Sequence, residues 1–211
     1  MNLPPITVLA VGLLQANCYI VHDPDRNSAL VIDPGDEPES ILQALGGARV
    51  ERILLTHAHF DHIGALEEVR TRTGAPVFVH EAEDSWLVNP WLNGSAFFGL
   101  PPVTCQPADG HLVPGDVLEF AGRRFTIVHT PGHSPGSVSL IADGLVICGD
   151  VLFRSSIGRT DLPGGDPRQL LDSITRHILP LADETVVLPG HGPATTVGLE
   201  RRTNPFLQNT G

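Results

Sequence analysis

The sequence predicts an α+β protein in which two β-sheets pack face to face and helices cover the outside. Short β-rich runs alternate with segments of helical spacing. Both halves of the chain follow the same order of strands, helix, strand and loop, and no change of composition marks a linker. Two packed sheets with outer helices bury such elements in the simplest way. At 211 residues the chain is long enough to form a core without disulfides, and we expect one domain over residues 1–211.

The first half opens with short strands that resemble a meander. Asp33-Pro34-Gly35 is a turn signal that closes one of them, and Gly46 and Gly74 stop the two helical patterns. Asp61 stands where the N-cap of the second helix would lie, ahead of apolar residues at helical intervals. The expected strands are 6–11, 18–21, 29–32, 52–55 and 77–79, and the expected helical segments are 37–45, 61–74 and 81–87.

A long segment in the middle of the chain is a candidate lid over a cleft. Residues 88–107 are rich in Pro, Gly and Asn. We expect the aromatic residues Trp91, Phe97 and Phe98 to pack under this loop in preference to contacting a substrate. Strands are expected at 117–120, 124–129, 137–141, 145–148 and 185–188, with a helix at 167–178 and a short helix after 197.

Charge and composition exclude several classes of partner. Thirteen basic against 24 acidic side chains give a formal charge of −11, which disfavours nucleic acid. No run approaches the roughly 20 apolar residues of a membrane helix, so no membrane is expected. The three cysteines form no CxxC pattern, and the N-terminal segment has no basic leading region. We therefore expect a cytoplasmic protein, and the sequence leaves its oligomeric state open.

The segment 56–62, THAHFDH, places three histidines and an aspartate directly after an apolar strand. In an extended loop His57 and His59 project to the same side and can bind one ion, whereas Asp61 and His62 lie past the bend and face a second position. Two adjacent metal ions are therefore expected. The second half offers three more ligands, each beside a glycine at a strand end: His133, Asp150 and His191.

The motifs THAHFDH, PGHSPG, CGD and PGHGP, in this order, resemble those of the metallo-β-lactamase superfamily. The resemblance spans residues 33–191 and implies a four-layer αββα sandwich with a two-metal site at the seam of its halves. It implies a first ion bound by His57, His59 and His133, a second bound by Asp61, His62 and His191, and Asp150 as the bridge.

A closer resemblance lies within the superfamily. Segments 149–153, 158–166, 189–193 and 200–207 are similar to short bacterial glyoxalase II-like (hydroxyacylglutathione hydrolase-like) enzymes. The similarity implies a thioester hydrolase for S-lactoylglutathione-like 2-hydroxyacyl thiol conjugates, with a hydroxide that bridges two divalent ions. We expect zinc, with iron or manganese as alternatives. Asp61 is expected to orient the hydroxide, and a general-base role is the alternative. The chain ends soon after Pro205, without the helical segment that supplies glutathione contacts in long glyoxalase II enzymes, so the thiol is open.

Arg159 falls where long glyoxalase II enzymes carry a basic residue that contacts glutathione. It is expected to anchor a substrate carboxylate, and pairing with Asp161 or Asp166 is an equal alternative. The rival activity is a persulfide dioxygenase with one Fe(II) held by His57, His133 and Asp150. Those enzymes usually carry Phe-Gln after the Gly-Arg-Thr-Asp of segment 158–161, and Ala-His-Asp where this chain has Gly-His-Gly. A non-catalytic metal-binding protein is a third reading, and the missing export signal and Asp150 disfavour antibiotic hydrolysis.

The remaining histidines and the cysteine next to the CGD motif have simpler explanations. Cys148 shares a strand face with Asp150 by the period of two, yet a small buried residue is favoured over a ligand. Surface or hydrogen-bonded structural roles are expected for His22, His80, His111, His129 and His177.

Overall fold

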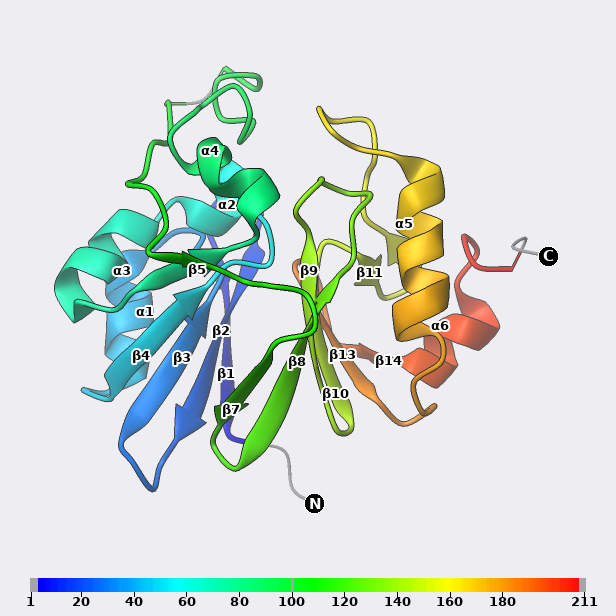
Figure 1. Ribbon diagram of the computed structural model, residues 1–211, viewed down its shortest axis with the longest axis horizontal. Helices are drawn as coiled ribbons and strands as arrows, with labels where there is room; N and C mark the ends of the chain where they lie inside the picture. The colour runs from blue at the N-terminus through cyan, green and yellow to red at the C-terminus, as the bar shows by residue number, and fades with distance from the viewer. Residues whose placement is uncertain (1–3, 100, 209–211) are drawn as a thin grey trace.

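The computed structural model describes residues 4–99 and 101–208. Two six-stranded sheets pack face to face between helices, which confirms the predicted α+β fold and the four-layer αββα sandwich (Figure 1). Two helices cover the outer face of the first sheet, and two helices cover the second. In chain order these four helices are α1 (Pro38–Leu45), α3 (Leu66–Thr73), α5 (Pro167–Ser173) and α6 (Val197–Thr203).

The first sheet has the strand order β1-β2-β3-β4-β5-β6. Its first three strands pair antiparallel, as the predicted meander requires, and the later pairs are parallel. The parallel strands end at the same edge, so the loop after β4 starts at that edge. The strands are β1 (Ile6–Val11), β2 (Ala16–Asp23), β3 (Ser28–Ile32), β4 (Arg49–Leu54), β5 (Val77–Val79) and β6 (Gly110–His111).

The second sheet has the order β14-β13-β10-β9-β8-β7, with β10 and β13 parallel. A two-stranded ribbon of β11 (Leu152–Phe153) and β12 (Ser156–Ile157) lies beside it. The sequence did not predict β6, β11, β12 or β14, because two residues are too few for an alternating pattern to be recognised. The six strands are β7 (Val117–Phe120), β8 (Arg123–His129), β9 (Val138–Ala142), β10 (Leu145–Gly149), β13 (Val186–Pro189) and β14 (Thr195–Thr196).

Three apolar clusters fill the spaces between the four layers. Strand β2 shows how one strand serves two of them: Cys18 and Ile20 face the helices α1 and α3, whereas Tyr19 and Val21 face the second sheet. The third cluster joins the second sheet to α5, α6 and a π-helical turn at Ile174–Ile178. Because both faces of each sheet are covered, the central strands are apolar almost throughout.

The helix after the histidine cluster begins earlier than predicted. Helix α2 spans Phe60–Ile63 with His59 as its N-cap, so Asp61 lies in the first turn and the predicted N-cap at Asp61 is wrong. The turn starts early because the Phe60 N–H bonds to the carbonyl of Asn93 and leaves His59 extended. The helix then breaks before α3, where Gly64 packs so closely on the carbonyl of Gly35 that a Cβ has no room.

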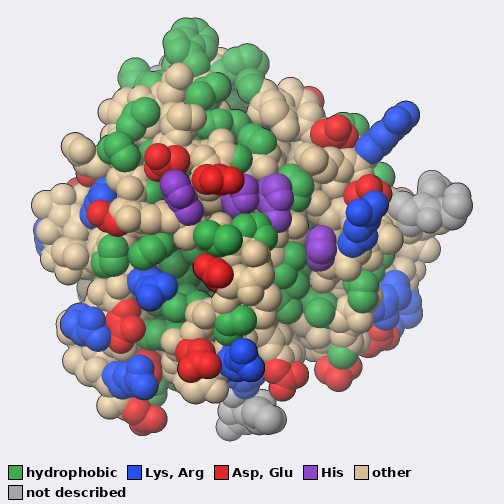
Figure 2. All heavy atoms as spheres, viewed as in Figure 1, with side chains coloured by type: hydrophobic (Ala, Val, Ile, Leu, Met, Phe, Trp, Pro, Cys, Tyr) green, Lys and Arg blue, Asp and Glu red, His purple; other side chains and the backbone are tan. Residues whose placement is uncertain are grey.

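The 88–107 segment, of which Leu100 lies outside the described residues, follows the 3-10 helix η1 (Glu81–Glu83) and α4 (Asp84–Leu87). Trp91, Phe97 and Phe98 are 66%, 55% and 44% exposed, so the predicted packing beneath the loop is wrong. Figure 2 shows hydrophobic side chains gathered at this end of the molecule. None of the described helices has the length and apolar character that a membrane crossing requires.

Candidate metal centre

The predicted ligands lie just beyond the ends of four strands, on loops and, for Asp61 and His62, in helix α2. The segment 56–62 follows β4, Asp150 follows β10, and His191 follows β13. His133 lies on the loop between β8 and β9. The structure therefore brings ligands from both halves of the chain to one edge of the sandwich, where the two sheets meet.

Three histidines form the first cluster, as predicted. One ligand nitrogen from each of His57, His59 and His133 lies within 4.8 Å of the other two. Nδ1 of His59 and Nε2 of His133 are 2.8 Å apart. All three side chains are buried.

Asp61, His62 and His191 form the second cluster, with ligand atoms that also lie within 4.8 Å of one another. The Asp61 carboxylate is 3.2 Å from Nε2 of His191 and 3.8 Å from Nε2 of His62. The grouping predicted for a second ion is thus reproduced by the fold.

Asp150 lies between the two clusters. Its Oδ1 is 3.5 Å from Nε2 of His62, and its Oδ2 is 3.6 Å from Nε2 of both His133 and His191. Gly149 permits this placement with a φ of +51°, and the strand register shifts between Ile147 and Gly149. The shift breaks the alternation that would place Cys148 beside Asp150. Cys148 instead packs in the cluster under α5, and the prediction of a small buried residue is confirmed.

The buried atoms that face one another fit a divalent cation. Among the described residues, Nε2 of His57, Nε2 of His62 and Oδ1 of Asp150 are buried without a hydrogen-bond partner. Unpaired buried polar atoms are costly unless a ligand completes them. A nitrogen and oxygen donor set of this kind suits zinc, iron or manganese. The two clusters are therefore suited to binding metal ions.

The opposite ring nitrogens hold the histidines in orientation. Nδ1 of His133 lies 2.8 Å from the carbonyl of Arg159, and Nδ1 of His191 lies 3.0 Å from the carbonyl of Leu14. Each ring donates its N–H there and leaves Nε2 as the ligand atom. Nδ1 of His62 is 3.0 Å from the Asp33 carboxylate.

Two buried acidic residues near the clusters were not predicted. Asp33 accepts hydrogen bonds from the N–H and hydroxyl of Thr56, and its carboxylate also lies near His57 and His62. Glu83 accepts hydrogen bonds from the backbone N–H of Ala58, on the loop of His57 and His59, and of Gly136, on the loop of His133. The Asp33-Pro34-Gly35 motif after a buried strand is the one signal in the sequence that points to Asp33, and on its own it indicates only a turn. Glu83 has no comparable signal in the sequence.

Burial and close charges set opposite pKa directions within the centre. Burial, with neighbouring histidines, puts the pKa of His57 well below its usual range and that of His59 at about 3. Burial also lowers the pKa of His62 and His191, but neighbouring Asp61 and Asp150 outweigh it and raise both.

The pKa values of the two carboxylates in the centre, Asp61 and Asp150, are lowered. Burial raises the pKa of Asp61, yet His62 and the hydrogen bond from His191 outweigh it, and the net pKa is lowered. The pKa of Asp150 is likewise lowered, because His62 and His133 outweigh burial. Both carboxylates are therefore ionised at neutral pH.

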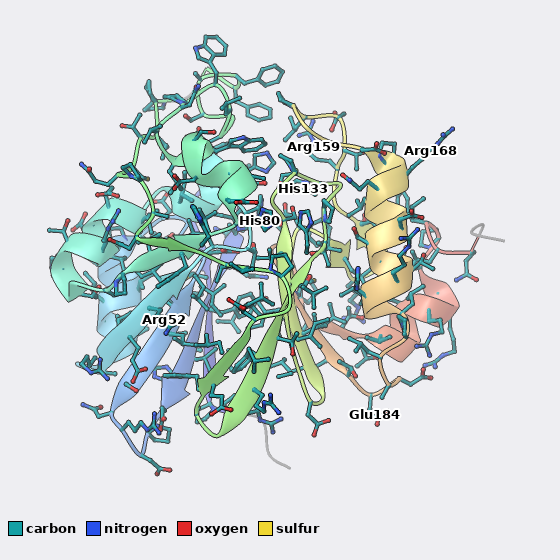
Figure 3. All side chains as sticks on the ribbon, in the orientation of Figure 1. Arg52, His80, His133, Arg159, Arg168 and Glu184 are labelled. Atoms are coloured by element: carbon teal, nitrogen blue, oxygen red, sulfur yellow. The ribbon has the colours of Figure 1, made fainter. Side chains whose placement is uncertain are left out.

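A cavity of about 290 Å³ opens onto the clusters. Ligands of both clusters form its floor, and Arg159 stands at its edge near His133 (Figure 3). Arg159 makes a two-bond ion pair with Asp161 at 2.7 and 2.8 Å, so the pairing alternative is present, whereas Asp166 caps α5. The apolar part of the wall consists of Leu14, Phe60, Phe98, Phe153, Ile157 and Leu162.

The other histidines lie outside the two clusters, in agreement with their predicted roles. His22 bonds Thr7, and His80 stacks on His129 with ring centroids 4.4 Å apart. Nε2 of His129 bonds the carbonyl of Pro135. His111 and His177 are exposed.

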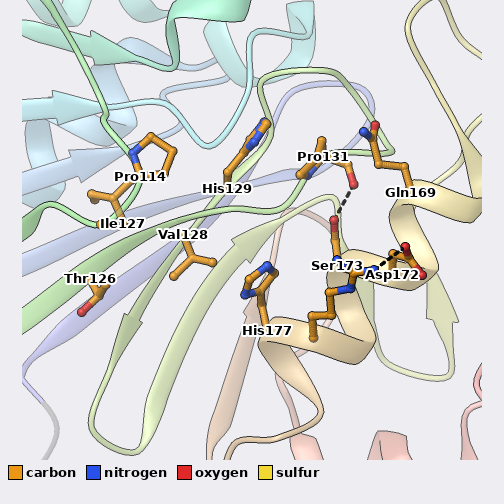
Figure 4. Close-up of a pocket in the computed structure, with 12 residues that line it drawn as sticks. Pro114, Thr126, Ile127, Val128, His129, Pro131, Gln169, Asp172, Ser173 and His177 are labelled. Carbon is orange, nitrogen blue, oxygen red and sulfur yellow. Dashed lines mark hydrogen bonds and ion pairs between the residues drawn. The ribbon is translucent and has the colours of Figure 1, made fainter.

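A larger cavity, of about 650 Å³, lies between β8 and α5 (Figure 4). Three of its polar side chains are engaged with neighbours: Ser173 donates to the carbonyl of Pro131, and Asp172 pairs with Arg176. It contains none of the predicted metal ligands.

Comparison with known proteins agrees with this geometry. The model of the Metallo-beta-lactamase superfamily matches residues 11–191. The chain belongs to the metallo-β-lactamase superfamily. The resemblance drawn from the motifs is thereby confirmed, and the matched region contains all seven predicted ligands.

Relatives of this superfamily member include two bacterial proteins of similar length. The chain is 48% identical to "Probable metallo-hydrolase YqgX" of Bacillus subtilis, over 94% of this chain and 95% of the relative. It is 36% identical to "Hydroxyacylglutathione hydrolase GloC" of Haemophilus influenzae, over 97% and 98%.

Solved structures of superfamily members also superpose on the fold. The BLEG-1 B3 metallo-beta-lactamase gives a TM-score of 0.92 at 45% identity, covering 97% of this chain and all of that one. The structure of TTHA1623 in a di-iron-bound form gives a TM-score of 0.84 at 42% identity, covering 95% of this chain and all of that one. ETHE1 from Myxococcus xanthus gives a TM-score of 0.75 at 29% identity, covering 95% of this chain and 83% of that one.

Proposed function

We propose that this protein is a dinuclear metal-dependent thioester hydrolase that acts on S-lactoylglutathione-like 2-hydroxyacyl thiol conjugates. The observation that carries the proposal is the pair of clusters joined by Asp150. The 36% identity to a hydroxyacylglutathione hydrolase supports the choice of substrate. We further propose a cytoplasmic location and a small-molecule partner, without nucleic acid or membrane.

The residues would hold two divalent ions in the arrangement expected from the motifs. His57, His59 and His133 would bind one ion, Asp61, His62 and His191 the other, and Asp150 would contact both. Two such ions supply Lewis acidity and lower the pKa of coordinated water toward neutrality. We propose zinc, with iron or manganese as alternatives, because the donors are nitrogen and oxygen and a 42% identical structure is described as di-iron-bound.

Asp61 is the residue proposed to orient the attacking water. Its side chain is 15% exposed and forms part of the cavity wall. The lowered pKa makes its carboxylate a weak base, since an efficient general base has a pKa near the working pH. The carboxylate therefore accepts a hydrogen bond and aims the water, and the general-base alternative is the weaker one.

The walls of the cavity are proposed to separate the reacting thioester from bulk water. Phe60 and Phe98 pack with ring centroids 5.9 Å apart and join the metal-binding loop to the 88–107 segment. Arg159 lies over the ring of Phe98, 5.8 Å from its centroid. Asp161 occupies Nε and Nη2 of Arg159, which leaves Nη1 for a substrate carboxylate.

The alternative function is a persulfide dioxygenase with one Fe(II). It would use His57, His133 and Asp150, and the structure brings His133 and Asp150 to 3.6 Å. The complete second cluster weighs against it, because a single-iron enzyme of this kind needs three protein ligands and open positions.

The deciding experiment combines elemental analysis with a substrate panel. Protein purified with full metal occupancy should contain two ions per chain and release thiol from S-lactoylglutathione and related conjugates. A β-lactam and glutathione persulfide complete the panel. Absence of thiol release from every conjugate would refute the proposal. One iron per chain with oxygen consumption on the persulfide would establish the alternative.

The Arg159→Ala variant tests the proposed anchor. Removing a charge-assisted hydrogen bond of about 1.5–3 kcal/mol should raise KM roughly tenfold or more for a conjugate whose thiol carries a carboxylate. The kcat should change little, and a conjugate without that carboxylate should be unaffected. Arg168→Ala is the matched control, because Arg168 points away from the cavity at the start of α5 (Figure 3). An unchanged KM for both conjugates would assign Arg159 to loop structure alone.

A further inference from the structure

Glu83 is a carboxylate with no exposed surface and, among the described residues, no cationic partner. Its partners are the N–H groups of Ala58 and Gly136, at 2.6 and 2.7 Å, and the hydroxyl of Ser134. Burying a carboxylate without a counter-ion is expensive unless hydrogen bonds compensate. An amide or an apolar residue would fill the site at lower cost if only packing mattered.

The two N–H groups belong to the loops that supply the three-histidine cluster. Ala58 lies between His57 and His59, on the loop after β4. Gly136 lies three residues after His133, on the loop before β9. One carboxylate oxygen accepts from each loop, so Glu83 ties a loop of the first sheet to a loop of the second.

The Glu83 side chain packs tightly between the two loops. A Cβ on Gly136 would lie 2.8 Å from Cγ of Glu83, so the glycine allows the close approach. Trp86, on the adjoining α4, places its ring 5.5 Å from that of His59. The segment 81–87 thus supports the three-histidine cluster through backbone hydrogen bonds and through a ring contact.

The second cluster has different supports. Asp33 holds His62, and the carbonyl of Leu14 holds His191. Among the described residues, the hydrogen bonds of the Glu83 side chain are with the two loops named above, and none is with Asp33 or Leu14. The two proposed metal positions can therefore be disturbed separately.

We propose that Glu83 is a positioning residue that sets the distance between His57, His59 and His133, and so controls the metal affinity of the three-histidine cluster alone. Without this carboxylate between the loops, the first ion binds more weakly while the second binds as before. The inference rests on the proposed function, because it assumes that both clusters bind metal. What it adds is that Glu83 sets the ratio of the metal affinities of the two clusters.

The test is Glu83→Gln, measured with Co²⁺ by absorption titration and chelator competition. The amide offers one acceptor oxygen, so one of the two backbone N–H groups faces an NH₂ group and loses its bond. We expect the affinity of one site to fall at least tenfold, within the roughly 10-fold to 100-fold range of outer-shell changes. The other site should change less than about twofold, and the spectrum should lose the contribution of one ion. Glu81→Gln is the matched control, because Glu81 is exposed on the same short helix.

Glu83→Asp is the conservative variant that should partly restore metal affinity. It also replaces Glu83→Gln in the test if the Gln variant does not fold. It keeps both acceptor oxygens but moves them by one methylene, so the affinity loss should be smaller and confined to the same site. An unchanged ratio of the two affinities, or equal weakening of both sites, overturns the proposal. Wild-type protein that binds no Co²⁺ would instead refute the proposed function itself.

Discussion

The partner on the second ring nitrogen differs among the histidines of the centre. His133 and His191 donate to backbone carbonyls, whose positions are fixed by the chain. His62 faces the carboxylate of Asp33, which also accepts two hydrogen bonds from Thr56. Asp33 has a φ of +52°, an unfavourable conformation for a residue with a side chain. Several contacts therefore converge on one strained acidic residue, and all of them fix the start of the histidine loop.

Asp33→Asn should weaken the cluster of Asp61, His62 and His191, because the Asp33 carboxylate orients the ring of His62. The amide keeps one acceptor oxygen for three donors, so a buried donor loses its partner at a cost of about 1–3 kcal/mol in the free energy of unfolding. Metal affinity of that cluster should fall about 10-fold to 100-fold. Chelator competition and urea unfolding measure the two effects. Asp25→Asn, at an exposed position, is the control, and equal results for both variants would contradict the assignment.

Sequence reasoning identified the six residues of the two clusters and Asp150 between them, but it missed the residues that hold them in place. The ligands were recognisable because each lies in a short glycine-flanked motif at a strand end. Asp33 and Glu83 act on backbone N–H groups that lie 23 and up to 53 residues away. Any buried acidic residue could make such contacts, and only the folded chain shows which one does. Arg159 was placed correctly at the cavity, but its pairing with Asp161 was only one of two open alternatives.

At the scale of the elements, the parallel pair β10 and β13 brings two ligand loops together. The Gly190 N–H donates to the carbonyl of Gly149 at 2.8 Å, which ties the loop of His191 to the loop of Asp150. A Cβ on Gly190 would overlap Oδ1 of Asp150 and lie 2.9 Å from Cε1 of His62. The missing side chain of Gly190 is thus the space that the bridging carboxylate occupies.

Gly190→Ala should therefore displace Asp150 and weaken both proposed metal sites together. We expect the affinity for each ion to fall at least tenfold, with a loss of about 1–3 kcal/mol in the free energy of unfolding from overpacking. Isothermal titration with Zn²⁺ and denaturant unfolding give both quantities. Gly46→Ala is the control: its φ of +59° makes alanine cost about 1 kcal/mol, yet nothing lies within 4 Å, and metal binding should not change. Unimpaired zinc binding by the Gly190 variant would contradict the bridging role of Asp150.

The longer strands and helices could be predicted from the periodicity of apolar residues. The predictions failed where contacts between residues distant in sequence determine the local structure. The strands of five to eight residues lie close to their predicted ranges, because alternation or continuous apolar character marks them. The start of α2 depends on a hydrogen bond from Phe60 to Asn93, 33 residues later, which no local pattern could indicate. The aromatic residues after α4 were expected to be buried from their type alone, and the loop leaves them exposed.

At the scale of the whole molecule, each proposed metal position takes ligands from both sheets. The first sheet supplies His57, His59, Asp61 and His62, and the second supplies His133, Asp150 and His191. Ions bound at both positions would cross-link the halves of the sandwich. Any ligand that binds only the folded state stabilises it, by about 2.7 kcal/mol at one hundred times its dissociation constant. Removing the metal should therefore lower the stability of the whole fold and not only that of the loops.

The effect of metal removal should depend on pH in a defined direction. In the metal-free protein His62 and His191 have pKa values raised above the ordinary 6.5, so their contribution to stability is complete below 6.5 and is lost as pH rises through the folded-state values. His57 and His59 are neutral throughout this range, and the lowered pKa values of Asp61 and Asp150 matter only in acid.

Metal binding needs neutral imidazoles, so zinc must displace the protons of His62 and His191 and binds more tightly as pH rises. The Tm of the metal-free protein should therefore fall as the pH rises above the ordinary histidine pKa of 6.5, while the Tm gain on zinc saturation grows. Calorimetric melting of both forms across this range measures the two trends, and titration in buffers of different ionisation enthalpy measures the protons released. A Tm gain that stays constant or shrinks as pH rises, with no proton release, would show that these two histidines do not bind the metal.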